Sequence, residues 1–114
     1  MPYNEELAER VRKLLIRRKN FSERKMFGGI CFMLGGNMCC GVTKKNLMLR
    51  LGKQKAEKAL KEEPFTKEMN FTGKSIKSMI YVEKGGYQEE DDLKGWVKKA
   101  ASFASSLPVK KKKE

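Results

Sequence analysis

Residues 25–34 have the sequence KMFGGICFML and lead through Gly35-Gly36 into a second apolar run, Met38 to Val42, within a second expected strand at about residues 37–43. A two-residue Gly-Gly link supplies the positive φ angles that a type I′ turn requires, so the two runs predict an antiparallel β-hairpin. Gly28-Gly29, inside the first run, fits neither a Walker loop nor a dinucleotide-binding loop. We expect this pair to serve close backbone packing or a bulge in the strand.

Both faces of this hairpin are predicted to be apolar. The turn pairs Leu34 with Asn37, and the same register sets Cys31 opposite Cys40. One face then carries Ile30, Phe32, Leu34 and Cys39, and the other carries Cys31, Met33, Met38, Cys40 and Val42. Because one helix layer covers only one face of a sheet, we expect another helix, a second subunit or a bound segment on the second face.

Hydrophobic periodicity places the other elements. Asn4 can cap a helix over about residues 5–19, which leaves Ile16 roughly opposite its apolar stripe. Strands are expected at 47–51, 65–71 and 76–82, and helices at 53–61 and from a cap at Asp91 or Asp92 to about residue 107. The order α-β-β-β-α-β-β-α predicts an α+β fold with an antiparallel sheet.

Length and composition are those of one globular domain. A chain of 114 residues with 39% hydrophobic residues can build one core, and we expect a single domain over residues 1–109. Residues 110–114 carry four lysines and predict a basic flexible tail, since like charges repel and nothing apolar anchors them.

The net charge of +12 favours polyanionic partners, namely nucleic acid, acidic protein surfaces or anionic lipid. Three cysteines, an odd number, and the lack of an apolar signal segment predict free thiols and a cytoplasmic location. The apolar runs are too short to cross a bilayer, so we expect no membrane association.

The chain contains no histidine, which removes the imidazole base of most hydrolases and the most common metal ligand. No pair of carboxylates lies on an apolar strand where burial would tune its pKa. The sequence therefore predicts a protein that is not an enzyme, with no catalytic residue, cofactor or metal.

A family resemblance rests on motifs along nearly the whole chain, from about residue 4 to residue 110. Residues 24–29, RKMFGG, match the Arg-x-Met-Phe-Gly-Gly signature of the TfoX N-terminal domain family, the TfoX/Sxy group. Residues 47–50, LMLR, resemble its Leu-Tyr-Leu-Arg strand, and residues 73–78, GKSIKS, are similar to its Gly-Arg-Pro-Met-Lys-Gly turn. Residues 96–108 resemble its closing helix. Ser75 and Ser78 replace the usual Pro and Gly, and Gly35-Gly36 replaces an Asp-Gly turn.

The resemblance implies an α+β domain similar to secretion-chaperone-like folds, in a group whose named members regulate competence for DNA uptake. It implies no catalytic residue. Those regulators carry a separate, helical C-terminal domain, for which a chain ending at Glu114 has no room, so we expect a stand-alone N-terminal domain. The leading hypothesis is a regulatory or protein-interaction module linked to transcription.

Candidate interface residues come from the hairpin and the first helix: Ile16, Cys31, Met33, Met38 and Cys40. Six methionines give an adaptable apolar set that suits docking, with ordinary core packing as the alternative: Met26, Met33, Met38, Met48, Met69 and Met79. A homodimer through the second apolar face is one expected use. Opposed Cys31 and Cys40 also admit a disulfide, a soft-metal site or plain packing.

The rival hypothesis is nucleic-acid binding, weak and salt-dependent, through a basic helix and the lysine tail. The candidate polyanion contacts are Arg10, Arg12, Lys13, Arg17, Arg24, Lys25, Arg50, Lys110, Lys111, Lys112 and Lys113. Thiol redox chemistry at Cys31, Cys39 and Cys40 is a third alternative.

Overall fold

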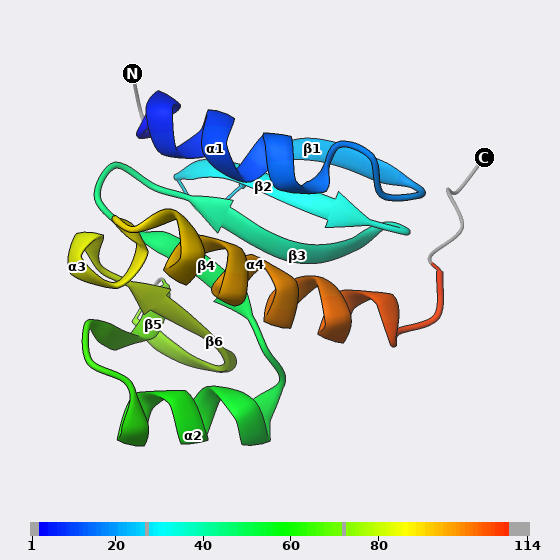
Figure 1. The fold of residues 1–114 in the computed structure, drawn as a ribbon. Helices are drawn as coiled ribbons and strands as arrows, with labels where there is room; N and C mark the ends of the chain where they lie inside the picture. Colours follow the sequence, from blue (N-terminus) through cyan, green and yellow to red (C-terminus); the bar gives the residue numbers. More distant parts are fainter. Residues whose placement is uncertain (1–2, 27, 72, 110–114) are drawn as a thin grey trace.

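The computed structural model of this chain describes residues 3–26, 28–71 and 73–109. In these ranges, six strands form one antiparallel sheet in the order β1-β2-β3-β4-β6-β5 (Figure 1). The strands are β1 (Phe21–Met26), β2 (Gly29–Leu34), β3 (Asn37–Val42), β4 (Leu47–Arg50), β5 (Thr66–Phe71) and β6 (Lys74–Val82). The helices are α1 (Glu5–Leu15), α2 (Lys53–Glu62), α3 (Lys84–Tyr87) and α4 (Glu90–Ser105). The predicted α+β class with an antiparallel sheet is confirmed.

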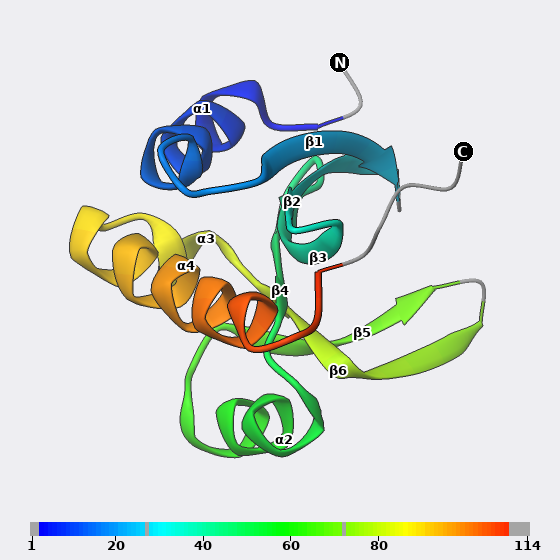
Figure 2. The same cartoon turned by 90° about the vertical axis from the view of Figure 1, so that its right-hand side faces the viewer.

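Helices α1 and α4 lie on the same side of the sheet, as Figure 2 shows. Helix α4 packs on β3 and β4, α1 packs on α4 and β3, and α2 packs on β6. The main core lies between these helices and the sheet, and its large members include Leu7, Val11, Leu15, Phe32, Leu47, Leu49, Ile80, Leu93 and Trp96. The apolar stripe that the sequence predicted for the first helix therefore faces this core, as do the buried apolar residues of α4.

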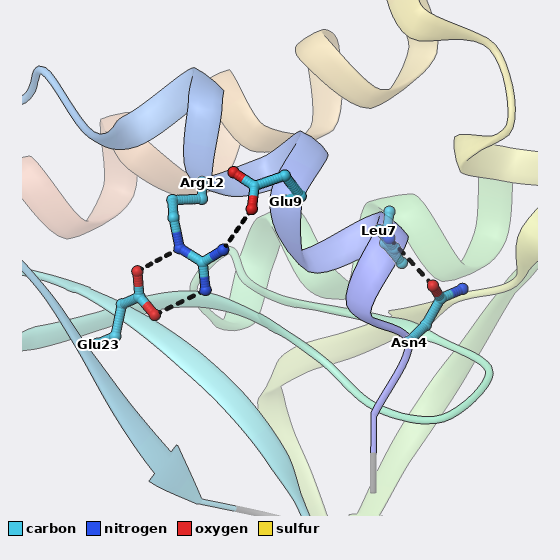
Figure 3. A network of polar contacts seen from close by, with 5 residues as sticks. All are labelled: Asn4, Leu7, Glu9, Arg12 and Glu23. Carbon is cyan, nitrogen blue, oxygen red and sulfur yellow. Dashed lines mark hydrogen bonds and ion pairs between the residues drawn. The ribbon is translucent and has the colours of Figure 1, made fainter. Parts of the chain in front are cut away.

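Helix α1 begins as predicted, because Asn4 Oδ1 accepts a hydrogen bond from the Leu7 amide at 3.0 Å (Figure 3). It ends at Leu15, four residues before the expected end. Leu7, Val11 and Leu15 are buried, but the next positions on that face hold the exposed Arg18 and Lys19. With nothing apolar to pack, the helix gains little from a further turn.

Strand β1 was missed by the sequence prediction, which placed one strand at residues 25–34. Gly28 has a φ of +74° and separates β1 from β2. The predicted strand was therefore wrong in its first part. Ser22 to Lys25 are exposed along this edge strand, so β1 carries no apolar alternation to detect.

A β-bulge between β2 and β3 corrects the predicted register. Leu34 pairs with Asn37 as expected, but Phe32 pairs with Cys40 and Cys31 pairs with Gly41. The expected pairing of Cys31 with Cys40 is wrong, because Cys39 is an extra residue in β3. One inserted residue moves every following side chain to the other face. Cys40 and Val42 therefore lie in the core beneath the helices.

Helix α4 begins earlier than the sequence predicted. Glu89, not Asp91 or Asp92, is the N-cap of α4, and its side chain makes no capping hydrogen bond. The short helix α3, which contains Gly85-Gly86, is absent from the predicted elements.

Two arginines of α1 bind the helix to its neighbours. Arg12 donates to both carboxylate oxygens of Glu23 on β1, at 2.5 and 2.9 Å, and to Glu9 at 3.0 Å (Figure 3). Arg10 donates to the carbonyls of Tyr87 and Gln88 at 3.3 and 3.2 Å. Both side chains therefore hold α1 in place.

Candidate functional site

The sheet face away from α1 and α4 gathers sulfur-containing side chains. Its buried members form a second cluster, separate from the main core: Cys31, Met33, Met38, Met48, Met69 and Met79. Met26, Ile76 and Tyr81 are partly buried and pack against this cluster. We call these nine residues the methionine face. Each of the six strands contributes one methionine to it.

The centre of the methionine face is closed within one chain. Cys31, Met48 and Met69 are fully buried, and Met33 remains 8% exposed. In Figure 2 the β5–β6 hairpin and the end of β1 project to the same side of β4, away from α4, so the sheet bends around this face. The expectation that the whole second face needs an outside cover is therefore wrong for its centre. Its rim, formed by Met26, Ile76 and Tyr81, remains partly exposed.

Gly41 makes the close packing of this centre possible. A Cβ at this position would lie 2.7 Å from Met48 Cε and 3.1 Å from Cys31 Sγ. The side chains of Cys31, on β2, and Met48, on β4, therefore occupy the space next to Gly41 of β3, where any other residue would place its Cβ. Thioether chains with three rotatable bonds fill such irregular space well.

The structure brings together only some of the predicted interface residues. Cys31, Met33 and Met38 share the methionine face, whereas Cys40 lies fully buried in the main core. Ile16 follows α1 in the helix layer and is 55% exposed. The six methionines that the sequence grouped as an adaptable set all belong to this face, but its rim residues Ile76 and Tyr81 were missed.

The three thiols are free and buried. Burial raises the pKa of the Cys31 thiol to about 11, and this thiol donates to the Met26 carbonyl at 3.8 Å. The thiol of Cys40 also has a raised pKa, first through its hydrogen bond with Cys39 and then through burial. In this environment the thiols pack as small apolar groups. Within the described residues, no three His, Cys, Asp or Glu side chains gather as a metal site.

The raised pKa of Cys31 predicts a loss of stability in alkali. The unfolded thiol ionises near pH 9.0, whereas the folded thiol stays protonated up to about pH 11. Between these values the unfolded chain binds fewer protons, so the free energy of unfolding falls as pH rises, by at most about 2–3 kcal/mol for this group. Urea unfolding at about pH 8 and about pH 10.5 measures this loss.

Cys31→Ala supplies the control for that experiment, since other groups that titrate in alkali are present in both proteins. The variant starts less stable, but it should lose less free energy of unfolding between the two pH values. Equal losses in the two proteins would contradict burial of an unionised Cys31 thiol.

Most of the chain matches the sequence model of one known protein family. The model of the TfoX N-terminal domain family matches residues 13–104 of the 114-residue chain. The chain belongs to the TfoX N-terminal domain family. A search of the curated proteins found no match. The matched range includes all six strands, and with them the whole methionine face.

The predicted polyanion contacts of this TfoX N-terminal domain fall into three groups. Arg10 and Arg12 bind partners inside the domain, and Arg50 lies over the Phe103 ring with 5.6 Å between Cζ and the ring centroid. Four predicted contacts are exposed: Lys13, Arg17, Arg24 and Lys25. The predicted tail lysines, residues 110–113, lie outside the described residues. No helix within the described ranges has the length and apolar character needed to cross a bilayer.

Proposed function

We propose that this TfoX N-terminal domain is a non-enzymatic module that acts through protein contacts in cytoplasmic gene regulation, with the methionine face as its docking surface. One observation supports this proposal most directly. Every strand of the sheet contributes a methionine to the one face that neither α1 nor α4 covers. A hydrophobic core built mainly from methionine is unusual, because the flexible methionine side chain does not favour a single packing arrangement.

The chemistry of this face suits binding better than catalysis. Thioether side chains are flexible and polarizable, so they can repack around an incoming apolar side chain at low cost. Met26, Ile76 and Tyr81 are partly exposed and would make the first contacts. Cys31 is the central thiol of this face, and its pKa of about 11 leaves it protonated near neutral pH. A protonated thiol is a weak nucleophile.

Charge placed on the rim tests the proposal. Ile76→Glu adds a carboxylate to the methionine face, and Ile16→Glu adds the same group to an exposed position beside α1. Because two copies of the chain can dock through this face as a homodimer, light scattering after gel filtration should give twice the chain mass for the wild-type protein and for Ile16→Glu. Ile76→Glu should give the mass of one chain, because a carboxylate buried in an apolar contact is costly.

Pull-down from the native lysate extends this experiment to other proteins. A partner bound through this face should be retained by Ile16→Glu and lost from Ile76→Glu. A monomeric wild-type protein that retains no partner would contradict the proposed function, provided that circular dichroism shows all three proteins folded.

A further inference from the structure

The buried part of the methionine face is built from sulfur-containing side chains. Among the described residues, its buried members are one cysteine and five methionines. The main core buries leucine, valine, isoleucine and aromatic side chains, and none of its members in the described ranges is a methionine. The fold therefore gathers its thioethers around one thiol, and both groups are soft metal ligands.

Gly41 brings two of these sulfur-containing side chains together. Cys31 on β2 and Met48 on β4 are the cross-strand neighbours of Gly41 on β3, so the three residues form one row across the sheet. A Cβ on Gly41 would lie 3.1 Å from Cys31 Sγ and 2.7 Å from Met48 Cε, the methyl carbon bonded to the thioether sulfur. Both side chains therefore reach the same space. Rotation about the χ angles of Met48 can bring its sulfur and the thiol to one metal ion.

Met26 supplies a third sulfur on the other side of Cys31. Strands β1 and β3 flank β2, and the Cys31 thiol lies 3.8 Å from the carbonyl oxygen of Met26, the last residue of β1. The Met26 side chain packs against the methionine face and is partly exposed at its rim. It therefore lies where an ion would enter from solvent, whereas Cys31 and Met48 are fully buried.

We propose that Cys31, Met48 and Met26 bind one copper(I) ion. Thiolate and thioether sulfur favour Cu⁺, whereas Mg²⁺ and Ca²⁺ take oxygen ligands. The ion replaces the thiol proton, which passes to solvent, so Cu⁺ and the thiolate together carry no net charge. A neutral pair suits this apolar site, whereas a divalent ion would leave a positive charge buried without a partner.

Copper(I) binding goes beyond the protein contacts proposed above and needs no partner protein. It is measured on the chain alone, whereas docking is tested with Ile76→Glu, a change on β6. Strands β3 and β4 separate β6 from β2 and from Cys31. Either proposal can therefore fail while the other holds.

Anaerobic titration of the full chain with Cu⁺, in competition with the chromophoric chelator bathocuproine disulfonate, tests this proposal. The wild-type chain should take one Cu⁺ from the chelator. Met48→Leu keeps the side-chain volume but removes the sulfur, so it should weaken binding by about 10-fold or more. Cys31→Ala should weaken binding further and remove the ultraviolet thiolate-to-copper absorption. A wild-type chain that takes no Cu⁺ would overturn the proposal.

Two matched variants separate this site from the other sulfur atoms of the chain. Met69→Leu makes the same change as Met48→Leu at an equally buried methionine on β5, which β3, β4 and β6 separate from Cys31. Cys40→Ala removes a buried thiol from the main core. Both should keep the copper(I) affinity within about 3-fold of the wild type. An equal loss in Met69→Leu and Met48→Leu, or wild-type affinity in a Cys31→Ala chain that circular dichroism shows to be folded, would contradict the assigned ligands.

Discussion

Replacing Gly29 with alanine is expected to lower the free energy of unfolding by about 3 kcal/mol or more. A Cβ at Gly29 would lie only 2.0 Å from the Val42 carbonyl oxygen and 3.2 Å from Thr43 Cα. Both are backbone atoms, so no side-chain rotation can relieve the contact. β2 and β3 would have to separate at the Ile30–Val42 pair, where the main core begins. Urea unfolding followed by circular dichroism measures the loss.

Gly95→Ala is the matched control, because it makes the same chemical change at an open position. Gly95 is exposed in the middle of α4, and apart from its chain neighbours and the backbone of its own helix no atom lies within 4 Å of a Cβ built there. Alanine in a helix interior is more favourable than glycine, so this variant should gain about 0.5–1 kcal/mol. If Gly29→Ala proved as stable as the wild-type protein, the close approach of β2 to β3 would be wrong.

Trp96→Ala is the second large effect, with an expected loss of about 3–5 kcal/mol. Trp96 is 7% exposed in the main core, and its Nε1–H donates to the Gly86 carbonyl at 3.1 Å. The ring joins α4 to α3, so truncation leaves a cavity and an unpaired buried carbonyl together. Urea unfolding must be followed by circular dichroism, because Trp96 is the chain's one tryptophan and the variant has no indole fluorescence.

Trp96→Phe separates the two contributions. It keeps an aromatic ring in the core but removes the hydrogen bond to Gly86, so its loss should be intermediate, about 1–3 kcal/mol. Ile16→Ala, at a position that is 55% exposed, should change stability by no more than about 0.5 kcal/mol. A loss for Trp96→Ala as small as that for Ile16→Ala would rule out the described packing of α4.

The parts of the fold that the sequence predicted are those with a clear period and a buried face. Helix α4 carries apolar residues at helical spacing, strand β4 is a short apolar run with a leucine at every second position, and both were found close to their predicted bounds. Strand β1 has no such pattern, since it is an exposed edge whose Glu23 pairs with Arg12. Tertiary contact, not periodicity, makes residues 21–26 a strand.

The candidate site was predictable in its composition but not in its arrangement. Met48 lies between Leu47 and Leu49, and Met79 precedes Ile80, so the alternation of β4 and β6 predicts that these two methionines face away from the main core. That β6 lies between β4 and β5, and so joins Met79 to Met48, is a property of the sheet order. The strand order depends on contacts between distant segments, so no local pattern in the sequence predicts it.

The bulge at Cys39 has a consequence for how this domain folds. β2 and β3 are buried on both faces, so a hairpin without the bulge, with Cys31 opposite Cys40, hides almost as much apolar surface as the native one. The burial of apolar surface alone therefore does little to favour one register over the other. The native register puts Cys40 and Val42 under α4, which comes from the far end of the chain. We therefore expect the alignment of the hairpin to become fixed only when α4 packs on β3, a contact between distant parts of the chain.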